Sequence, residues 1–289
     1  MRGALAAEAA WPAPAKLNLC LHILGRRADG YHQLQTLFQF LDYGDQLSFQ
    51  LRADACIQRI NGPRDLPAEA DLCVRAAKLL REEAGIASGV DIALQKRLPM
   101  GGGLGGGSSD AATTLVALNR LWGVDWPVAQ LAQLGLQLGA DVPVFVHGVA
   151  AWAEGVGEQL SPVEDERLDE PFYLVITPAC EVSTAAVFNH PQLTRDSAPL
   201  KIAAFFEGRM GNDCLAVVRS EYPEVAAALD WLDGFAPARL TGTGSSVFAA
   251  FTQRGAALAA QAQVPEGWQS FVARGLNRSP LLKRLELPA

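Results

Sequence analysis

Six of the seven residues from Gly101 to Gly107 are glycine, and this run constrains the chain more than any other segment. Apolar residues 98–100 precede it, and the run connects an expected strand over residues 90–94 to an expected helix. Glycine has no Cβ, so successive backbone N–H groups can turn toward one concavity, and the start of a helix adds partial positive charge. The segment therefore predicts a phosphate-binding loop rather than a flexible linker, which would have polar, low-complexity flanks.

The run does not match the best-known phosphate-binding segments. A P-loop requires a lysine directly after its last glycine, and here the first lysine after the run is Lys201. The dinucleotide fingerprint Gly-x-Gly-x-x-Gly is matched by Gly101, Gly103 and Gly106, but nearly any glycine run would match it. Asp125 lies at a suitable distance for a ribose contact, yet it follows an expected helix instead of ending a strand. The motifs of protein kinases are absent. Because the glycines do match the dinucleotide fingerprint, a dinucleotide-binding oxidoreductase stays open as an alternative.

The composition excludes several classes of protein. The chain has 289 residues, of which 49% are apolar and 19% charged, and its formal net charge is -7. This apolar content is ample for a packed core, and an acidic chain does not favour nucleic-acid binding. No apolar run approaches the ~20 residues of a membrane span. Five scattered cysteines without a Cys-x-x-Cys pair predict neither a zinc site nor a disulfide framework. Because Glu8 and Pro12 interrupt the apolar start of the chain, we expect no secretory leader and a cytoplasmic protein.

Turn residues and apolar spacing predict an α+β fold. In the first half we expect strands over 14–60, with turns at 29–30 and 43–45, and a further strand over 90–94. We expect helices over 70–84 and 127–138. Another helix should begin at residues 108–110, which are of types that cap helices, and end at Gly123. In the second half we expect strands at 172–176 and 269–273, helices around 200–210, 213–232 and 254–263, and a strand, turn and strand over 238–251. The charged, proline-containing stretch 161–171 predicts an exposed connection between two domains.

Three motifs resemble those of the GHMP kinases, the family of galactokinase, homoserine kinase, mevalonate kinase and phosphomevalonate kinase. They are the glycine loop with its flanks at 99–112, Pro-Ala-Lys-Leu-Asn-Leu at 14–19, and Leu-Thr-Gly-Thr-Gly-Ser-Ser-Val at 240–247. Their order and spacing extend the resemblance over essentially the whole chain. The resemblance implies an N-terminal domain like ribosomal protein S5 domain 2 at 1–155, a ferredoxin-like C-terminal domain at 156–289, an active site between them, and ATP with Mg2+.

Three further segments narrow the resemblance to one branch of the family. Residues 25–40, 139–145 and 275–281 are similar to the members that phosphorylate the 2-hydroxyl of a diphosphocytidyl-linked methylerythritol in the non-mevalonate route to isoprenoids. Another small-molecule kinase of the same family is the nearest alternative. A non-catalytic nucleotide-binding module is disfavoured, because Lys16 and Asp141 occur together. The metal ligands and the oligomeric state stay open.

The resemblance implies catalytic roles for Lys16 and Asp141. Asp141 would be the general base, a task that suits a carboxylate. From the residues alone, its position before Val-Pro favours a turn residue. Lys16 lies in an otherwise apolar strand pattern, where an unpaired ammonium is costly, so it either has a partner or reaches solvent at a strand end. We expect Asp141 to be that partner, with Lys16 polarising the accepting hydroxyl or steadying the transferred charge.

The remaining implied residues bind the two substrates. Ser108 and Ser109 could bind a phosphate oxygen or Mg2+ through their hydroxyls, or cap the helix. Asn18 shares the strand face of Lys16 and suits a hydrogen bond to the substrate. The ATP-binding set is Lys96, Pro99, Met100, Gly101, Gly102, Gly103, Leu104, Gly105, Gly106, Gly107, Ser108 and Ser109. The substrate-binding set is Asn18, Tyr31, His32, Thr184, Phe188, Thr243 and Gly244, with Tyr31 stacking on the cytosine, His32 bonding its edge and Phe188 on the opposite face.

Overall fold

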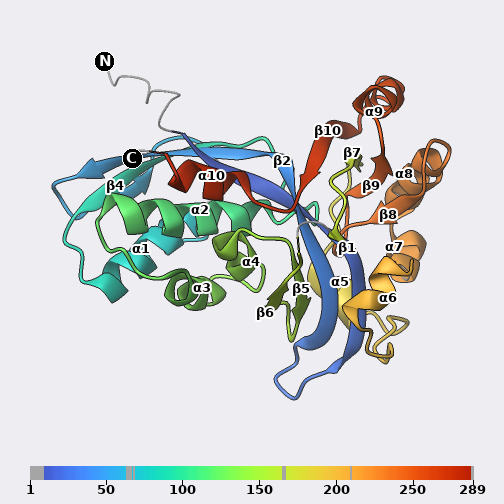
Figure 1. Cartoon of the computed structure of the whole chain (residues 1–289), viewed down its shortest axis with the longest axis horizontal. Helices are drawn as coiled ribbons and strands as arrows, with labels where there is room; N and C mark the ends of the chain where they lie inside the picture. The colour runs from blue at the N-terminus through green and yellow to red at the C-terminus, as the bar shows by residue number, and fades with distance from the viewer. Residues whose placement is uncertain (1–9, 63–66, 68, 165–166, 209, 288–289) are drawn as a thin grey trace.

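The computed structural model describes residues 10–62, 67, 69–164, 167–208 and 210–287. Its fold is α+β, as expected, and one sheet runs through it with the strand order β3-β4-β2-β10-β7-β9-β8 (Figure 1). The strands of the first part are β1 (Trp11–Arg26), β2 (His32–Arg52), β3 (Ile57–Arg59), β4 (Gly89–Gln95), β5 (Ala151–Glu154) and β6 (Gln159–Pro162). The strands of the second part are β7 (Phe172–Thr177), β8 (Ala238–Leu240), β9 (Val247–Phe251) and β10 (Gln269–Leu276).

The two longest strands, β1 and β2, pair antiparallel and contribute the most residues to the first part of the sheet. The expected turn at 43–45 is wrong, because these residues lie inside β2. Gly44 is instead required by close packing: a Cβ there would lie 2.2 Å from the carbonyl oxygen of Ala13. The register shifts at this point, since Pro14 pairs with Gly44 but Lys16 pairs with Phe40. This irregularity immediately precedes the strand segment that carries Lys16.

Five helices pack on one face of the first part of the sheet: α1 (Leu72–Ala84), α2 (Gly106–Leu121), α3 (Val128–Leu136), α4 (Val142–His147) and α10 (Pro280–Leu285) (Figure 1). Their apolar side chains form one core with those of β1 and β2, including Trp11, Phe40, Leu115 and Phe145. The expected capping role of 108–110 is wrong. Helix α2 already begins at Gly106, after Gly105 in a left-handed conformation, so these three residues lie inside the helix.

The second part of the sheet is covered by α5 (Thr184–Asn189), α6 (Ile202–Phe206), α7 (Leu215–Glu221), α8 (Pro223–Asp233) and α9 (Arg254–Gln261). The expected helix over 213–232 is divided into α7 and α8 at Tyr222, because Pro223 disfavours a helical conformation at the residue before it. Strand β10 joins the two parts of the sheet. Its residues 269–274 pair with β7, while Gly275 and Leu276 pair with β2, and α10 then packs beside β1.

Among the described residues, no helix is both long and apolar enough to cross a bilayer.

Candidate active site

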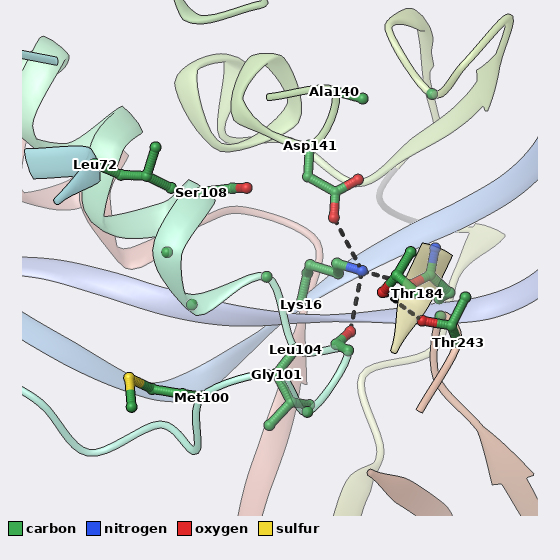
Figure 2. Close-up of a pocket in the computed structure, with 18 of the residues that line it drawn as sticks. Lys16, Leu72, Met100, Gly101, Leu104, Ser108, Ala140, Asp141, Thr184 and Thr243 are labelled. Carbon is green, nitrogen blue, oxygen red and sulfur yellow. Dashed lines mark hydrogen bonds and ion pairs between the residues drawn. The ribbon is translucent and has the colours of Figure 1, made fainter. Parts of the chain in front are cut away.

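A pocket of about 840 Å³ lies where the glycine loop meets the two parts of the sheet. Its walls come from β1 and β2, the start of α1, the glycine loop, the residues before α4, helix α5 and the loop between β8 and β9. Figure 2 shows Lys16 and Asp141 pointing toward one another, with Thr184 and Thr243 to one side of the pair and Ser108 to the other. The three motifs of the sequence therefore converge on one cavity.

Left-handed glycines shape the loop. Gly101, Gly103 and Gly105 have φ values of 72°, 74° and 72°, a region that side chains strongly disfavour. A Cβ at Gly103 would lie 2.4 Å from the carbonyl oxygen of Thr241, and one at Gly105 would lie 2.8 Å from the ring of Phe145. The glycines therefore serve close packing as well as access to the backbone N–H groups.

Lys16 has three partners around its ammonium, which is almost fully buried. Its Nζ lies 3.2 Å from Oδ2 of Asp141, so the expected pairing is confirmed. The same ammonium donates to the carbonyl oxygen of Gly103 at 3.1 Å and to Oδ1 of Asn18 at 2.5 Å. The side chain of Asp141 is one-third exposed, at 33%, against 4% for Lys16. The pair thus presents a solvent-accessible carboxylate backed by a buried cation.

Asn18 bonds to the protein on both sides of its amide. Its Oδ1 accepts from Lys16 and its Nδ2 donates to Oγ1 of Thr36 at 2.9 Å. Its backbone N–H donates to Oγ1 of Thr241 at 3.0 Å. With these partners, Asn18 fixes the position of the Lys16 ammonium.

The Thr241–Ser246 loop is tied to the glycine loop. The Ser246 N–H donates to the carbonyl oxygen of Gly102 at 3.1 Å, and the Ser246 hydroxyl bonds that of Thr177 at 2.8 Å. Thr243 and Thr184 line the pocket and share a hydrogen bond of 2.9 Å between their hydroxyls. The two glycine-containing loops, far apart in sequence, therefore hold each other in place.

Aromatic residues line the end of the pocket at α5. Tyr31 is exposed, whereas His32 is buried and its ring stacks on that of Phe188 at 5.0 Å between centroids. Nε of Arg195 donates to Nε2 of His32 at 3.2 Å. Burial, followed by the positive charges of Arg195 and Arg26, lowers the pKa of His32 below its usual value. His32 is consequently neutral at neutral pH.

Lys96 lies in a compact charge cluster on the α1 side of the pocket. Its Nζ contacts Oδ2 of Asp45 at 2.6 Å and Oδ2 of Asp110 at 2.8 Å. Burial opposes the ammonium, but the two carboxylates raise the pKa of Lys96 above its usual value. Burial raises the pKa of Asp110 to about 7, against the lowering effect of Lys96. One cation is thus shared between two buried carboxylates.

The structure brings nearly all of the sequence-derived site residues to this pocket; only Ser109 and Gly244 are not among its lining residues. Ser109 is fully buried in α2, and Gly244 packs near Leu240 and Val182. Sequence reasoning missed several lining residues, among them Asp71, Leu72, Cys73, Asp110, Val156 and Gly157. Asp71 caps α1, a signal visible in the sequence, but nothing local indicates that this helix start faces the glycine loop.

Asp141 and Ser108 offer oxygen atoms to the pocket that could bind a divalent cation. No cluster of three or more His, Cys, Asp or Glu side chains suited to a metal occurs in the part of the chain that the structure describes. Mg2+ usually binds one or two protein oxygens together with phosphates and water, so it needs no such cluster. The carboxylate of Asp141 is accessible, and Ser108 lies at the pocket near Gly139, with its Oγ 3.7 Å from the place of a Cβ there. These donors fit Mg2+ carried by a nucleotide.

Comparison with known proteins gives consistent matches. The model of the GHMP kinases N terminal domain matches residues 71–149, and that of the GHMP kinases C terminal region matches residues 193–270. A relative from Nitrosococcus oceani named 4-diphosphocytidyl-2-C-methyl-D-erythritol kinase is 59% identical over 276 residues, covering 96% of this chain and 98% of the relative.

Solved structures agree with these matches. The crystal structure of a 4-(cytidine 5'-diphospho)-2C-methyl-D-erythritol kinase superposes with a TM-score of 0.77 at 33% identity, covering 92% of this chain and 98% of the other. A mevalonate kinase superposes with a TM-score of 0.69 at 15% identity, over 93% of this chain and 99% of the other, which shows a shared fold alone.

Proposed function

The chain belongs to the GHMP kinases, in the family of 4-diphosphocytidyl-2-C-methyl-D-erythritol kinases, and on that premise we propose that it transfers the γ-phosphoryl group of ATP to the 2-hydroxyl of 4-diphosphocytidyl-2-C-methyl-D-erythritol. The products are the 2-phosphate and ADP, within the non-mevalonate route to isoprenoids. The observation that carries the proposal is the Lys16–Asp141 pair, 3.2 Å apart, beside the glycine loop in the pocket that Tyr31 and His32 also line.

Phosphoryl transfer requires positioned anions and one group that accepts a proton. The backbone N–H groups of 101–107 and the start of α2 are placed to bind the ATP phosphates. The acceptor hydroxyl lies against Asp141, which takes its proton as the oxygen bonds the γ-phosphorus and the bond from that phosphorus to the ADP oxygen breaks. The Lys16 ammonium pairs with Asp141 and offsets the negative charge that spreads over the transferred group.

The nucleotide carries its metal ion in this proposal. Phosphate oxygens, the Ser108 hydroxyl and water would hold Mg2+, with Asp141 close by. When bound, Mg2+ neutralises charge on the β- and γ-phosphates. We also place the reaction in the cytoplasm, which suits a chain whose cysteines are all free within the described residues.

The pocket end formed by Tyr31, His32 and Phe188 supports a cytosine-containing acceptor. Aromatic rings give a nucleobase a stacking surface, and homoserine and mevalonate contain no base to occupy it. Lys96 and the start of α1 border the opposite side of the cavity, which leaves that side for the ATP nucleoside. The pocket thus has room for two nucleotides, one on either side of Lys16.

The nearest alternative is phosphorylation of another small alcohol by the same catalytic pair. A direct test measures kcat/KM for the diphosphocytidyl substrate, homoserine and mevalonate under identical conditions with ATP. We expect turnover of the first and negligible turnover of the other two. Preferred phosphorylation of homoserine or mevalonate would contradict the proposal. Tight binding of NAD(P)H in place of ATP would point to an oxidoreductase.

A further inference from the structure

Arg195 contacts two of the aromatic residues of the pocket without lining the pocket itself. It lies in the segment after α5, and three of its guanidinium bonds accompany the one to His32. Nη2 donates to the carbonyl oxygens of Phe188 and His190, each at 2.8 Å, and Nη1 donates to that of Leu193 at 3.2 Å. These carbonyls lie at and beyond the C-terminal end of α5, where helices leave acceptors unpaired. Arg195 therefore fixes Phe188 and His32 against each other.

The bond to His32 also determines where the imidazole carries its proton. Arginine has only donors, so Nε2 of His32, which contacts Nε of Arg195, must be the unprotonated nitrogen. The proton of the neutral ring then sits on Nδ1. Among the described residues Nδ1 has no hydrogen-bond partner, nor is it one of their fully buried unpaired atoms, and His32 lines the pocket. His32 thus offers the pocket one N–H donor in a fixed orientation.

We propose that Arg195 is a positioning residue that makes the pocket select cytosine over uracil, by holding His32 as an Nδ1–H donor and Phe188 as a stacking surface. This inference rests on the proposed function. Cytosine presents an acceptor at N3, which pairs with an N–H donor, whereas uracil presents N3–H, which opposes one. Without Arg195 the His32 imidazole can turn or exchange its proton between its two nitrogens. The preference for cytosine over uracil then weakens.

The chain offers a matched control in Arg26. This arginine also links the 26–32 hairpin to α5, through bonds of 3.3 Å to the Gly30 carbonyl oxygen and 3.4 Å to Oδ1 of Asn189. Among the described residues, its side chain makes no hydrogen bond to His32 or to the backbone of Phe188. Arg26→Met therefore removes the same charge from the same region while leaving the contacts of Arg195 in place.

The test measures binding of CDP and UDP by calorimetry, in the presence of a non-hydrolysable ATP analogue, for wild type, Arg195→Met and Arg26→Met. We expect wild type to bind CDP more tightly than UDP. Arg195→Met should weaken CDP binding at least ~10-fold, because about one hydrogen bond and its geometry are lost. It should also reduce the ratio of the CDP affinity to the UDP affinity, called the CDP/UDP ratio below. In steady state, its KM for the diphosphocytidyl substrate should rise, with kcat and the KM for ATP near wild type. Arg26→Met should change the ratio little.

A second pair of variants separates the effect on His32 from general damage. In a His32→Ala background, adding Arg195→Met should leave the CDP/UDP ratio unchanged, although affinity still falls because Phe188 is released. If Arg195→Met does not fold, Arg195→Lys carries the same test, because a lysine has three donors on a single nitrogen and cannot reproduce the four bonds that Arg195 makes from three separate nitrogens. A wild-type ratio retained in Arg195→Met or Arg195→Lys would overturn this inference alone. Equal binding of CDP and UDP by wild type would overturn both the inference and the cytosine assignment.

Discussion

The ammonium of Lys16 lies 3.2 Å from the carboxylate of Asp141, and it also donates to the carbonyl oxygen of Gly103. One buried cation thus connects β1, the residue before α4 and the phosphate-binding loop (Figure 2). Through Lys16, the position of Asp141 is tied to that of the glycine loop. Three segments of the first part of the chain are thereby held together at the pocket.

Replacing Asp141 by Asn should remove the proton acceptor while keeping the shape of the side chain. We expect turnover to fall at least ~10²-fold, the usual scale for general-base catalysis, with ATP affinity and thermal stability near wild type. Steady-state kinetics and ATP titration measure this. Asp125→Asn, at an acidic residue that does not line the pocket, serves as control. Near-normal turnover of Asp141→Asn would show that Asp141 only positions the substrate.

Asn18→Ala should act through Lys16. Its Oδ1 holds the ammonium, so its loss lets Lys16 move away from Asp141 and is expected to lower kcat by about 10-fold or more with a smaller change in KM for either substrate. Thr36→Val, which removes only the second anchor of the Asn18 amide, should have a milder effect in the same direction. A rise in substrate KM at unchanged kcat would instead identify Asn18 as a direct substrate contact.

Gly103→Ala and Gly101→Ala form a matched pair in the glycine loop. Both residues have positive φ, so both variants carry similar backbone strain of about 1 kcal/mol. Only at Gly103 does a Cβ collide with backbone, 2.4 Å from the Thr241 carbonyl oxygen, whereas nothing lies within 4 Å at Gly101. Gly103→Ala should therefore lower the free energy of unfolding by a further ~1–3 kcal/mol. Equal denaturant midpoints for the two variants would contradict this packing.

Asp110 should give the stability of the protein a measurable dependence on pH. Its pKa is about 7 in the folded state because of burial, above its value near 4 in an unfolded chain. The folded state therefore binds the proton more tightly, and the contribution of Asp110 to stability falls as pH rises from about 4 to about 7. Asp110→Asn removes this dependence, so its stability relative to wild type should increase over that range.

Urea denaturation at pH 5 and pH 8 measures the effect. Asp45→Asn is the control from the same cluster: Asp45 accepts backbone N–H bonds from Arg97 and Leu98 as well as bonding Lys96, so this variant should be less stable at both pH values. An Asp110→Asn variant whose stability relative to wild type does not change with pH would contradict the raised pKa.

The sequence was most informative where one residue type has one physical purpose. The need of a buried Lys16 for a partner follows from the residues, and the structure shows Asp141 in that place. Gly44 was misinterpreted because a glycine required by a close strand crossing looks the same as a turn glycine. Likewise, the serines at 108–109 resemble caps, but Gly105 and Gly106 already start the helix.

Contacts between distant segments could not be predicted. The bond of Arg195 to His32 spans 163 positions, and the approach of Thr241 to Gly103 spans 138. Neither pair has a local pattern, because each depends on how β10 joins the two parts of the sheet. Asn18 lines the pocket, and its contact with the substrate stays a prediction. Its bond to Thr36 depends on the register of β1 and β2, which no local pattern gives.

The most direct test of the account is the identity of the phosphorylated product. Wild-type protein is incubated with ATP, Mg2+ and 4-diphosphocytidyl-2-C-methyl-D-erythritol, and the reaction is followed by phosphorus NMR. The account predicts one new monoester signal that appears in step with ADP while the diphosphate of the substrate stays intact. That signal should show no three-bond coupling to a proton, because the methyl-bearing C2 carries no hydrogen. ADP with inorganic phosphate and no monoester, or a phosphate on any other hydroxyl, would contradict it.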